Sequence, residues 1–203
     1  MTANKTLEAI SLFPQGNLTS LLVMLHGWGA NYQDLASLSQ MLDLPEFGYL
    51  FPNAPFEHPQ VPGGRAWYAL ESPNYTGIDE SRQLLFDWLN ALEDNTNIPL
   101  ERTYVTGFSQ GGAMTLDVAL MLPVAGICSI SGYLHYEPKP LEDDAPPVLI
   151  VHGKQDEVVP IDEAKNARDK LTAIGVEVQY QEFDMGHEIT PPVLDLLQKF
   201  ISN

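Results

Sequence analysis

The sequence predicts an α/β fold: a mostly parallel central sheet with an antiparallel N-terminal hairpin and helices on both faces. Apolar runs of strand length alternate with segments whose apolar residues recur at helical spacing, which is typical of such sheets. The runs 124–130 and 148–152 are apolar throughout, as expected for central parallel strands covered on both sides. The segments 7–13 and 21–26 are separated by the turn-forming residues 14–17, and this spacing predicts the hairpin.

The remaining elements follow in alternation along the chain. They are a helix over 35–42 capped by Asn31, a strand over 49–51 stopped by Pro52, a helix over 80–92, a strand over 103–106, a helix over 110–122, a helix over 161–174, a strand over 176–183 and a helix over 193–201. Two Pro-rich stretches interrupt this alternation. We expect 56–77 to form a pocket wall or lid and 133–147 to be solvated surface. Residues 1–203 are expected to form one domain.

Composition limits the classes of partner. The formal charge of −17 repels phosphate backbones and anionic lipid headgroups, so no nucleic-acid partner is expected. No apolar stretch reaches the length of a signal peptide or a membrane span, which predicts a cytoplasmic protein without stable membrane insertion. The single cysteine, Cys128, lies in an apolar run and is expected to be a buried, inert thiol. A monomer and a homodimer are both compatible with the sequence.

A nucleophile motif lies at the centre of the chain. Gly107-Phe-Ser-Gln-Gly111 matches the pattern Gly-x-Ser-x-Gly, and it follows the strand over 103–106 and opens the helix over 110–122. This is the nucleophile elbow of α/β-hydrolases, a strained turn that exposes the serine hydroxyl. Gly107 and Gly111 remove side chains that would crowd the turn. Ser109 is therefore the predicted nucleophile; the alternative is a structural turn with an incidental serine.

Serine needs a general base, and five histidines are available. In this fold the nucleophile, the acid and the base follow one another along the chain, which excludes His26 and His58. We expect His135 to be an exposed loop histidine and His152 to have a structural role. His187 lies in the loop between the last strand and the last helix, so it is the predicted base.

The acid that orients the base should lie on a different loop at the same sheet edge. Asp156 follows a buried strand and precedes a helix, which places it at the carboxyl edge of the sheet. Glu157 is expected to be solvated, Asp143 and Asp144 precede their strand, and Asp184 lies too near the base in sequence. Asp156 is the predicted acid, with a helix cap as the alternative role.

A tetrahedral intermediate requires donors for its negative oxygen. The backbone N–H of Gln110, the residue after the nucleophile, should be one, and the N–H of Trp28 in the loop after the strand over 21–26 the other. The side chains of Trp28 and Trp67 are candidates for the substrate pocket. A core position or a lid contact is the alternative for Trp28, and core packing is an equal alternative for Trp67. Hydrolysis by such a serine needs no metal or cofactor, so none is expected. A metal site of His152, Asp156 and His187 would have no recognised ligand spacing.

Six segments together resemble the phospholipase/carboxylesterase family, which includes the acyl-protein thioesterases. They are Leu25-His-Gly-Trp-Gly-Ala, Phe51-Pro-Asn-Ala-Pro55, Arg65-Ala-Trp-Tyr68, Gly107-Phe-Ser-Gln-Gly-Gly112, His152-Gly-Lys-Gln-Asp-Glu-Val-Val-Pro160 and Gly186-His187. The resemblance covers nearly the whole chain and implies the triad Ser109, Asp156 and His187. It also implies activity on small esters, lysophospholipids or acyl thioesters. Two departures are Trp28, where many members carry leucine, and the stretch 69–77, which does not match the acyl-binding loop of the thioesterase branch.

The expected function is that of a serine carboxylesterase that hydrolyses small or medium-chain esters, or lipid-like acyl substrates, through an acyl-enzyme. An acyl-protein thioesterase and a lysophospholipase are the alternatives. A non-catalytic ligand-binding protein on the same scaffold is a hypothesis from another class, and it would usually lack a triad member or an elbow glycine. An acyl transferase would share the acyl-enzyme and differ only in the acceptor.

Overall fold

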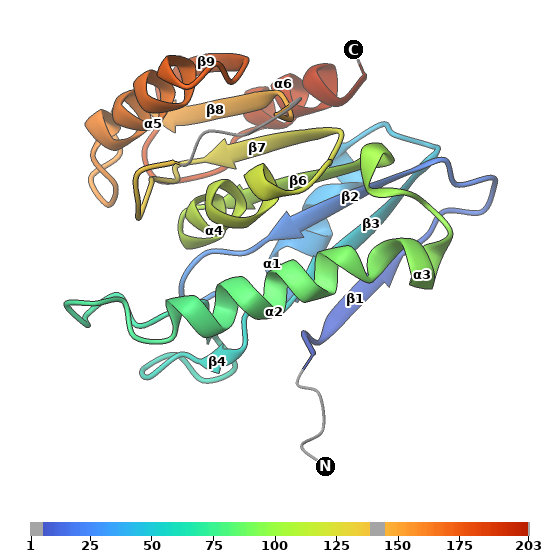
Figure 1. Cartoon of the computed structure of the whole chain (residues 1–203), viewed down its shortest axis with the longest axis horizontal. Coiled ribbons are helices and arrows are strands. Elements are labelled where there is room, and N and C mark those ends of the chain that lie inside the picture. Colours follow the sequence, from blue (N-terminus) through green and yellow to red (C-terminus); the bar gives the residue numbers. More distant parts are fainter. Residues whose placement is uncertain (1–5, 139–144, 203) are drawn as a thin grey trace.

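The fold is built on one seven-stranded sheet with the strand order β1-β3-β2-β6-β7-β8-β9 (Figure 1). The computed structural model describes residues 6–138 and 145–202. The strands of the sheet are β1 (Ala9–Leu12), β2 (Ser20–Leu25), β3 (Phe47–Pro52), β6 (Thr103–Phe108), β7 (Gly126–Ile130), β8 (Val148–Gly153) and β9 (Val178–Phe183). From β3 across to β9 every neighbouring pair is parallel, and β1 alone is antiparallel, at the edge. The predicted mostly parallel sheet with an antiparallel N-terminal strand is confirmed.

The pairing partner of the antiparallel strand differs from the predicted hairpin. β1 pairs with β3, with Ala9 opposite Pro52 and Leu12 opposite Tyr49, while β2 lies between β3 and β6. The reason is burial: β2 is buried over 21–25, whereas β1 is mostly exposed, so β1 takes the outer edge. The connection 13–19 easily reaches across one strand, because seven residues span up to about 24 Å and two strand spacings are about 10 Å.

The helices cover both faces of the sheet, as predicted. They are α1 (Tyr32–Ala36), α2 (Ile78–Asn90), α3 (Leu92–Thr96), α4 (Gln110–Val118), α5 (Ile161–Ala173) and α6 (Pro191–Ser202). The helices expected over 35–42 and 110–122 each end in a 3-10 turn, Ser37–Met41 and Ala119–Met121. The predicted cap is present, because the side chain of Asn31 accepts a hydrogen bond from the N–H of Gln33 at 2.8 Å.

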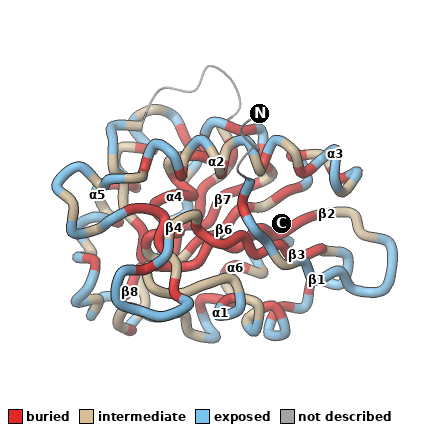
Figure 2. The backbone as a smooth tube through the Cα atoms, turned by 90° about the horizontal axis from the view of Figure 1, so that it is seen from below, coloured by how far each residue is buried: buried red, intermediate tan, exposed pale blue. Residues whose placement is uncertain are grey.

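Two apolar cores lie on opposite sides of the sheet. One core packs α2, α4 and α5 against the sheet, and the other packs α1 and α6 against the opposite face. The buried backbone runs along the central strands, and exposed segments surround it (Figure 2). Every residue of β7 and β8 is buried, whereas the edge strand β9 is alternately half-buried and exposed over most of its length. No helix among the described residues is long and apolar enough to cross a bilayer.

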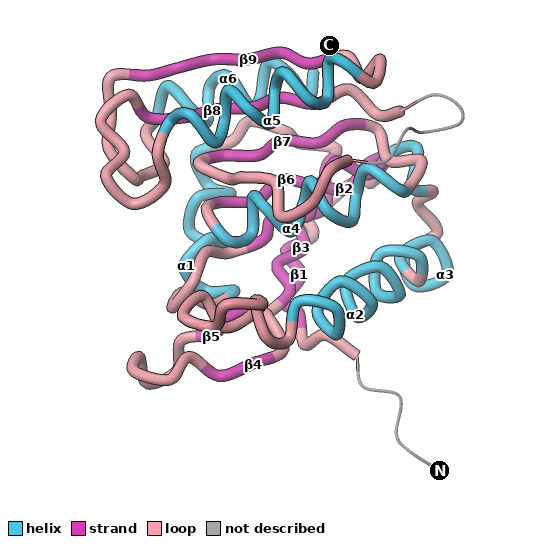
Figure 3. Tube along the Cα trace, turned by 60° about the vertical axis from the view of Figure 1, so that its left-hand side comes forward, coloured by secondary structure: helices cyan, strands magenta, loops and turns pink. Residues whose placement is uncertain are grey.

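The stretch 56–77 contains a two-stranded sheet of its own, β4 (Phe56–Glu57) and β5 (Arg65–Ala66) (Figure 3). The backbone of Arg65 accepts from Gly29 N–H at 2.9 Å and donates to the carbonyl of Ala30 at 2.8 Å. This stretch therefore lies against the segment that follows β2. Part of the second Pro-rich stretch, including Asp143 and Asp144, lies outside the described residues.

Candidate active site

The tight turn between β6 and α4 holds Ser109 in a strained conformation, with φ 55° and ψ −118°. The glycines on either side are required by close backbone approach. A Cβ on Gly107 would lie 2.2 Å from the carbonyl oxygen of Gly111, and a Cβ on Gly111 would lie 2.3 Å from that of Leu25. The turn therefore projects the serine at the carboxyl end of β6, which is the geometry of a nucleophile elbow.

The acid and the base predicted from the sequence are in direct contact. His187 Nδ1 lies 2.8 Å from Asp156 Oδ2, although the two residues come from the loops after β9 and β8. The second carboxylate oxygen, Oδ1, accepts from the N–H groups of Val158 and Val159 at 2.9 and 2.8 Å. Burial alone would raise the pKa of Asp156, but the hydrogen bonds from His187 and from these two N–H groups hold it below the ordinary value. The carboxylate is thus ionised and fixes His187 with its proton on Nδ1, leaving Nε2 to accept a proton.

The imidazole of His187 lies beside the nucleophile elbow. Its ring packs against that of Phe108, the residue before Ser109, with 4.7 Å between the ring centroids. The side chain of His187 is 17% exposed, so solvent and a substrate reach it. Among the described residues no hydrogen bond joins Ser109 Oγ to His187 Nε2. The structure thus pairs the acid with the base and brings the base to the elbow.

The loop after β2 lies against the nucleophile. A Cβ on Gly27 would lie 3.4 Å from the Cβ of Ser109. Within the described part of the chain the N–H groups of Trp28 and Gln110 have no acceptor, so both are free to bind an anionic oxygen. His26 holds this loop: its Nδ1–H donates to the carbonyl of Gly27 at 2.8 Å, and Nε2 accepts from Ala54 N–H at 3.0 Å. Burial lowers the pKa of His26 to about 4, so the ring stays neutral, as this pattern requires.

The two tryptophan side chains have different positions. Trp67 has no exposed surface, and its indole N–H donates to the carbonyl of His26 at 3.0 Å. Of the two roles that the sequence left open for Trp67, the structure favours core packing, because the side chain has no exposed surface. The ring of Trp28 is half-buried and lies 4.2 Å from that of His58 between centroids.

The side chain of Gln110 has a role that the sequence analysis missed. Its Oε1 accepts from Trp67 N–H at 2.8 Å, and its Nε2 donates to the carbonyl of Tyr68 at 2.9 Å. Ser81 Oγ donates to the carbonyl of Trp67, which ties the same segment to α2. Gln110 thus joins the stretch 56–77 to the elbow. Neither periodicity nor motif signals this contact, because it depends on the path of the loop.

The side chains of two other histidines have no exposed surface. His152 Nε2–H donates to the carbonyl of Val159 at 2.8 Å and lies 3.4 Å from Asp156 Oδ2, which is the structural position expected for it. The expectation that His135 is exposed is wrong: its side chain is 0% exposed and its Nδ1 lies 2.7 Å from Asp117 Oδ2. Across 6–138 and 145–202 no group of three or more His, Cys, Asp or Glu residues is arranged to hold a metal ion.

Comparisons with known proteins place the chain in a family. Residues 10–203 match the family model described as Phospholipase/Carboxylesterase. The acyl-protein thioesterase 1 homolog 1 of Dictyostelium discoideum is 27% identical, over 91% of this chain and 90% of the relative. Acyl-protein thioesterase 1 of Saccharomyces cerevisiae is 29% identical, over 89% of this chain and 90% of the relative.

A solved structure agrees with this placement. The crystal structure of esterase PE8 is 31% identical and superposes with a TM-score of 0.89, covering 98% of this chain and 99% of that one. The fold, the elbow and the relatives lead to the same conclusion. The chain belongs to the phospholipase/carboxylesterase family of α/β-hydrolases and is a hydrolase that acts on ester or thioester bonds.

Proposed function

We propose that the protein is a serine carboxylesterase that hydrolyses small or medium-chain carboxylic esters, with Ser109, His187 and Asp156 as its triad. The observation that carries this proposal is the 2.8 Å contact between His187 Nδ1 and Asp156 Oδ2 beside a strained serine elbow. A histidine fixed in this tautomer by a buried carboxylate is the base that a serine nucleophile needs.

In this mechanism Ser109 Oγ attacks the ester carbonyl carbon while His187 Nε2 takes the hydroxyl proton. The carbonyl oxygen becomes an oxyanion that accepts hydrogen bonds from the N–H groups of Trp28 and Gln110. The C–O bond to the alcohol then breaks, and His187 delivers its proton to the leaving oxygen. A water molecule attacks the acyl-enzyme with His187 again as base, which releases the carboxylic acid and restores Ser109.

Thioester hydrolysis is the second candidate, because the curated relatives above are named acyl-protein thioesterases. A thioester or a lysophospholipid would react at Ser109 by the same steps, with only the leaving group changed. A non-catalytic binding protein is disfavoured by the intact contact between His187 and Asp156. The cytoplasmic location and the monomeric or homodimeric state stay predictions.

A substrate panel tests the proposal. It compares p-nitrophenyl esters of two to twelve acyl carbons, an acyl-coenzyme A thioester and a lysophosphatidylcholine, for the wild type and Ser109→Ala. We expect the highest kcat/KM on a short or medium-chain ester and loss of that activity in Ser109→Ala. If kcat/KM is tenfold higher on the thioester than on the esters, the protein is a thioesterase rather than a carboxylesterase. No turnover of any substrate would contradict both proposals.

A further inference from the structure

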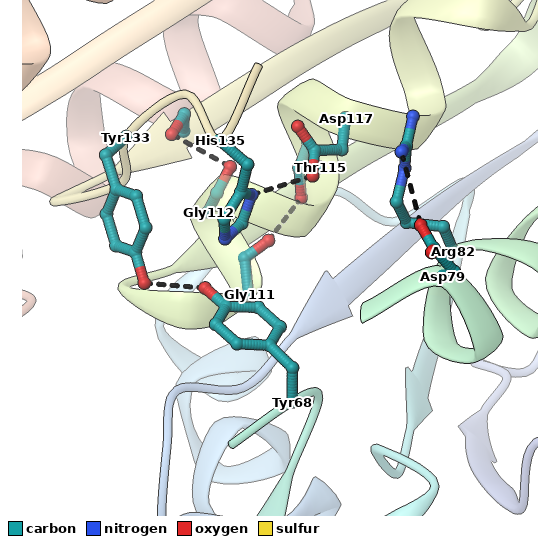
Figure 4. A network of polar contacts seen from close by, with 10 residues as sticks. Tyr68, Asp79, Arg82, Gly111, Gly112, Thr115, Asp117, Tyr133 and His135 are labelled. Carbon is teal, nitrogen blue, oxygen red and sulfur yellow. Dashed lines mark hydrogen bonds and ion pairs between the residues drawn. The ribbon is translucent and has the colours of Figure 1, made fainter. Parts of the chain in front are cut away.

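A partly buried polar and aromatic cluster lies beside α4, outside the triad, and Figure 4 shows its members other than Tyr75. We call it the tyrosine clasp, and it consists of Tyr68, Tyr75, Tyr133, His135 and Asp117. Tyr68 follows β5, Tyr133 and His135 follow β7, and Asp117 lies on α4. The hydroxyl oxygens of Tyr68 and Tyr133 are 2.5 Å apart, so one hydrogen bond joins the two loops.

Both loops of the clasp are tied directly to the nucleophile. The Gln110 side chain binds the backbone at Tyr68, as described above, and Ser109 N–H donates to the carbonyl of Ile130, at the end of β7, at 2.8 Å. The two loops therefore flank residues 109 and 110. The hydrogen bond between Tyr68 and Tyr133 connects these loops to each other.

A hydrogen bond and ring contacts hold His135 at the centre of the clasp. His135 Nδ1–H donates to Asp117 Oδ2, and the rings of Tyr68, Tyr75 and Tyr133 stand at steep angles to the imidazole, with centroids 4.7, 5.1 and 5.1 Å away. The Asp117 side chain is 4% exposed and that of His135 is 0% exposed, so removing either partner would leave a buried polar group unpaired. Burial raises the pKa of Tyr133 to about 12, so its hydroxyl keeps its proton at neutral pH.

The clasp and the base approach the elbow from opposite faces of the sheet. The ring of Phe108 contacts the imidazole of His187 and packs against the core on the α1 and α6 side. Tyr68 belongs to the core on the α2 and α4 side. His187 must reach the leaving group to protonate it, so the leaving group lies on its side of Ser109. On this argument an acyl chain bound to Ser109 would extend to the other side, toward the clasp.

We propose that Tyr133, held by Tyr68 and His135, is a specificity-determining residue whose ring ends the acyl site and restricts the enzyme to short acyl chains. Tyr68 is fully buried and Tyr133 is half-buried, so Tyr133 is the member of the pair that offers surface to a substrate. This inference rests on the proposed function, because it assigns the acyl side of the same site.

The test measures kcat/KM for p-nitrophenyl octanoate and for p-nitrophenyl acetate and takes the ratio of the first to the second. We expect this ratio to rise at least about tenfold in Tyr133→Ala. The smaller side chain leaves space for several methylene groups of the octanoyl chain, and each methylene bound in an apolar pocket raises kcat/KM by about tenfold or more. Tyr133→Phe keeps the ring and removes only the hydroxyl bond to Tyr68, so a smaller rise of about threefold is expected. If Tyr133→Ala does not fold, Tyr133→Leu, which also shortens the wall, is measured in its place.

Tyr180→Ala is the matched control, because the hydroxyl of Tyr180 bonds to Glu182 on the edge strand β9, outside the clasp. We expect its ratio to equal that of the wild type. A ratio within twofold of the wild type in a folded Tyr133→Ala enzyme overturns the specificity role. Failure of the proposed function looks different, since the wild type would then hydrolyse neither ester or Ser109→Ala would remain active.

Discussion

Replacing Asp156 by asparagine separates the orientation of the base from its presence. In the wild type Oδ1 accepts from two backbone N–H groups, of Val158 and Val159, while Oδ2 accepts from His187 Nδ1. The carbonyl oxygen of an asparagine must take the Oδ1 position. Turning the amide around would set its NH₂ group against two N–H donors, at a cost of about 1–3 kcal/mol for each hydrogen bond left unmade.

The NH₂ group of the asparagine therefore faces His187. Because it donates, it favours the imidazole tautomer with the proton on Nε2, which is unable to accept the proton of Ser109. For this kind of change we expect a loss of about 10⁴ in kcat. That factor corresponds to about 5.4 kcal/mol of transition-state stabilisation, at 1.36 kcal/mol for each factor of ten.

The assay is steady-state hydrolysis of p-nitrophenyl butyrate, with thermal melting to show that Asp156→Asn folds. Asp184→Asn and Glu157→Gln are matched controls on the neighbouring loops, because both side chains are exposed and Asp184 pairs with Lys154 rather than with His187. Both controls should keep kcat within about twofold, as surface substitutions do. A loss below tenfold in folded Asp156→Asn, or a large loss in Glu157→Gln, would refute the assignment of the acid.

Three further predictions concern the same machinery. Ser109→Ala should lower kcat by about 10⁴ or more with the fold intact, and a rate near that of the wild type would end its assignment as nucleophile. The free energy of unfolding of Ser109→Gly should exceed that of Ser109→Ala by about 1 kcal/mol, because φ is 55° at this position and glycine adopts it without strain; equal melting temperatures would contradict this. Burial lowers the pKa of His26 from its ordinary value of 6.5 to about 4 in the folded protein, so between these pH values only the unfolded chain binds the proton. The free energy of unfolding should therefore fall by about 1.4 kcal/mol per pH unit from this group as pH drops from 6.5 to 4, and His26→Gln should show a shallower fall; identical slopes in urea titrations would count against it.

Local pattern was sufficient to predict the order of the elements and the loops that carry the triad. Apolar runs identified the central strands β7 and β8, and the parallel arrangement then placed Ser109, Asp156 and His187 at one sheet edge. The contact between Asp156 and His187 agrees with that expectation. Their catalytic roles stay predictions until the variants are measured.

The pairing of distant strands and the conformation of the long loops could not be predicted from the sequence. The partner of β1 depends on which strands compete for the buried positions, so its antiparallel direction was predicted correctly but its neighbour was not. The burial of His135 and Trp67 depends on how two irregular segments fold over α4 and the elbow. A single sequence has no periodicity in such segments, and therefore no signal that distinguishes a buried ring from an exposed one.

Covalent labelling shows whether Ser109 is the nucleophile and whether Asp156 activates it through His187. The wild type and Ser109→Ala would be treated with a fluorophosphonate, and the modified peptide identified by mass spectrometry. We predict one stoichiometric adduct on Ser109, much slower labelling in Asp156→Asn, and none in Ser109→Ala. An adduct on another residue, or labelling of Ser109 that is equally fast without the Asp156 carboxylate, would contradict it.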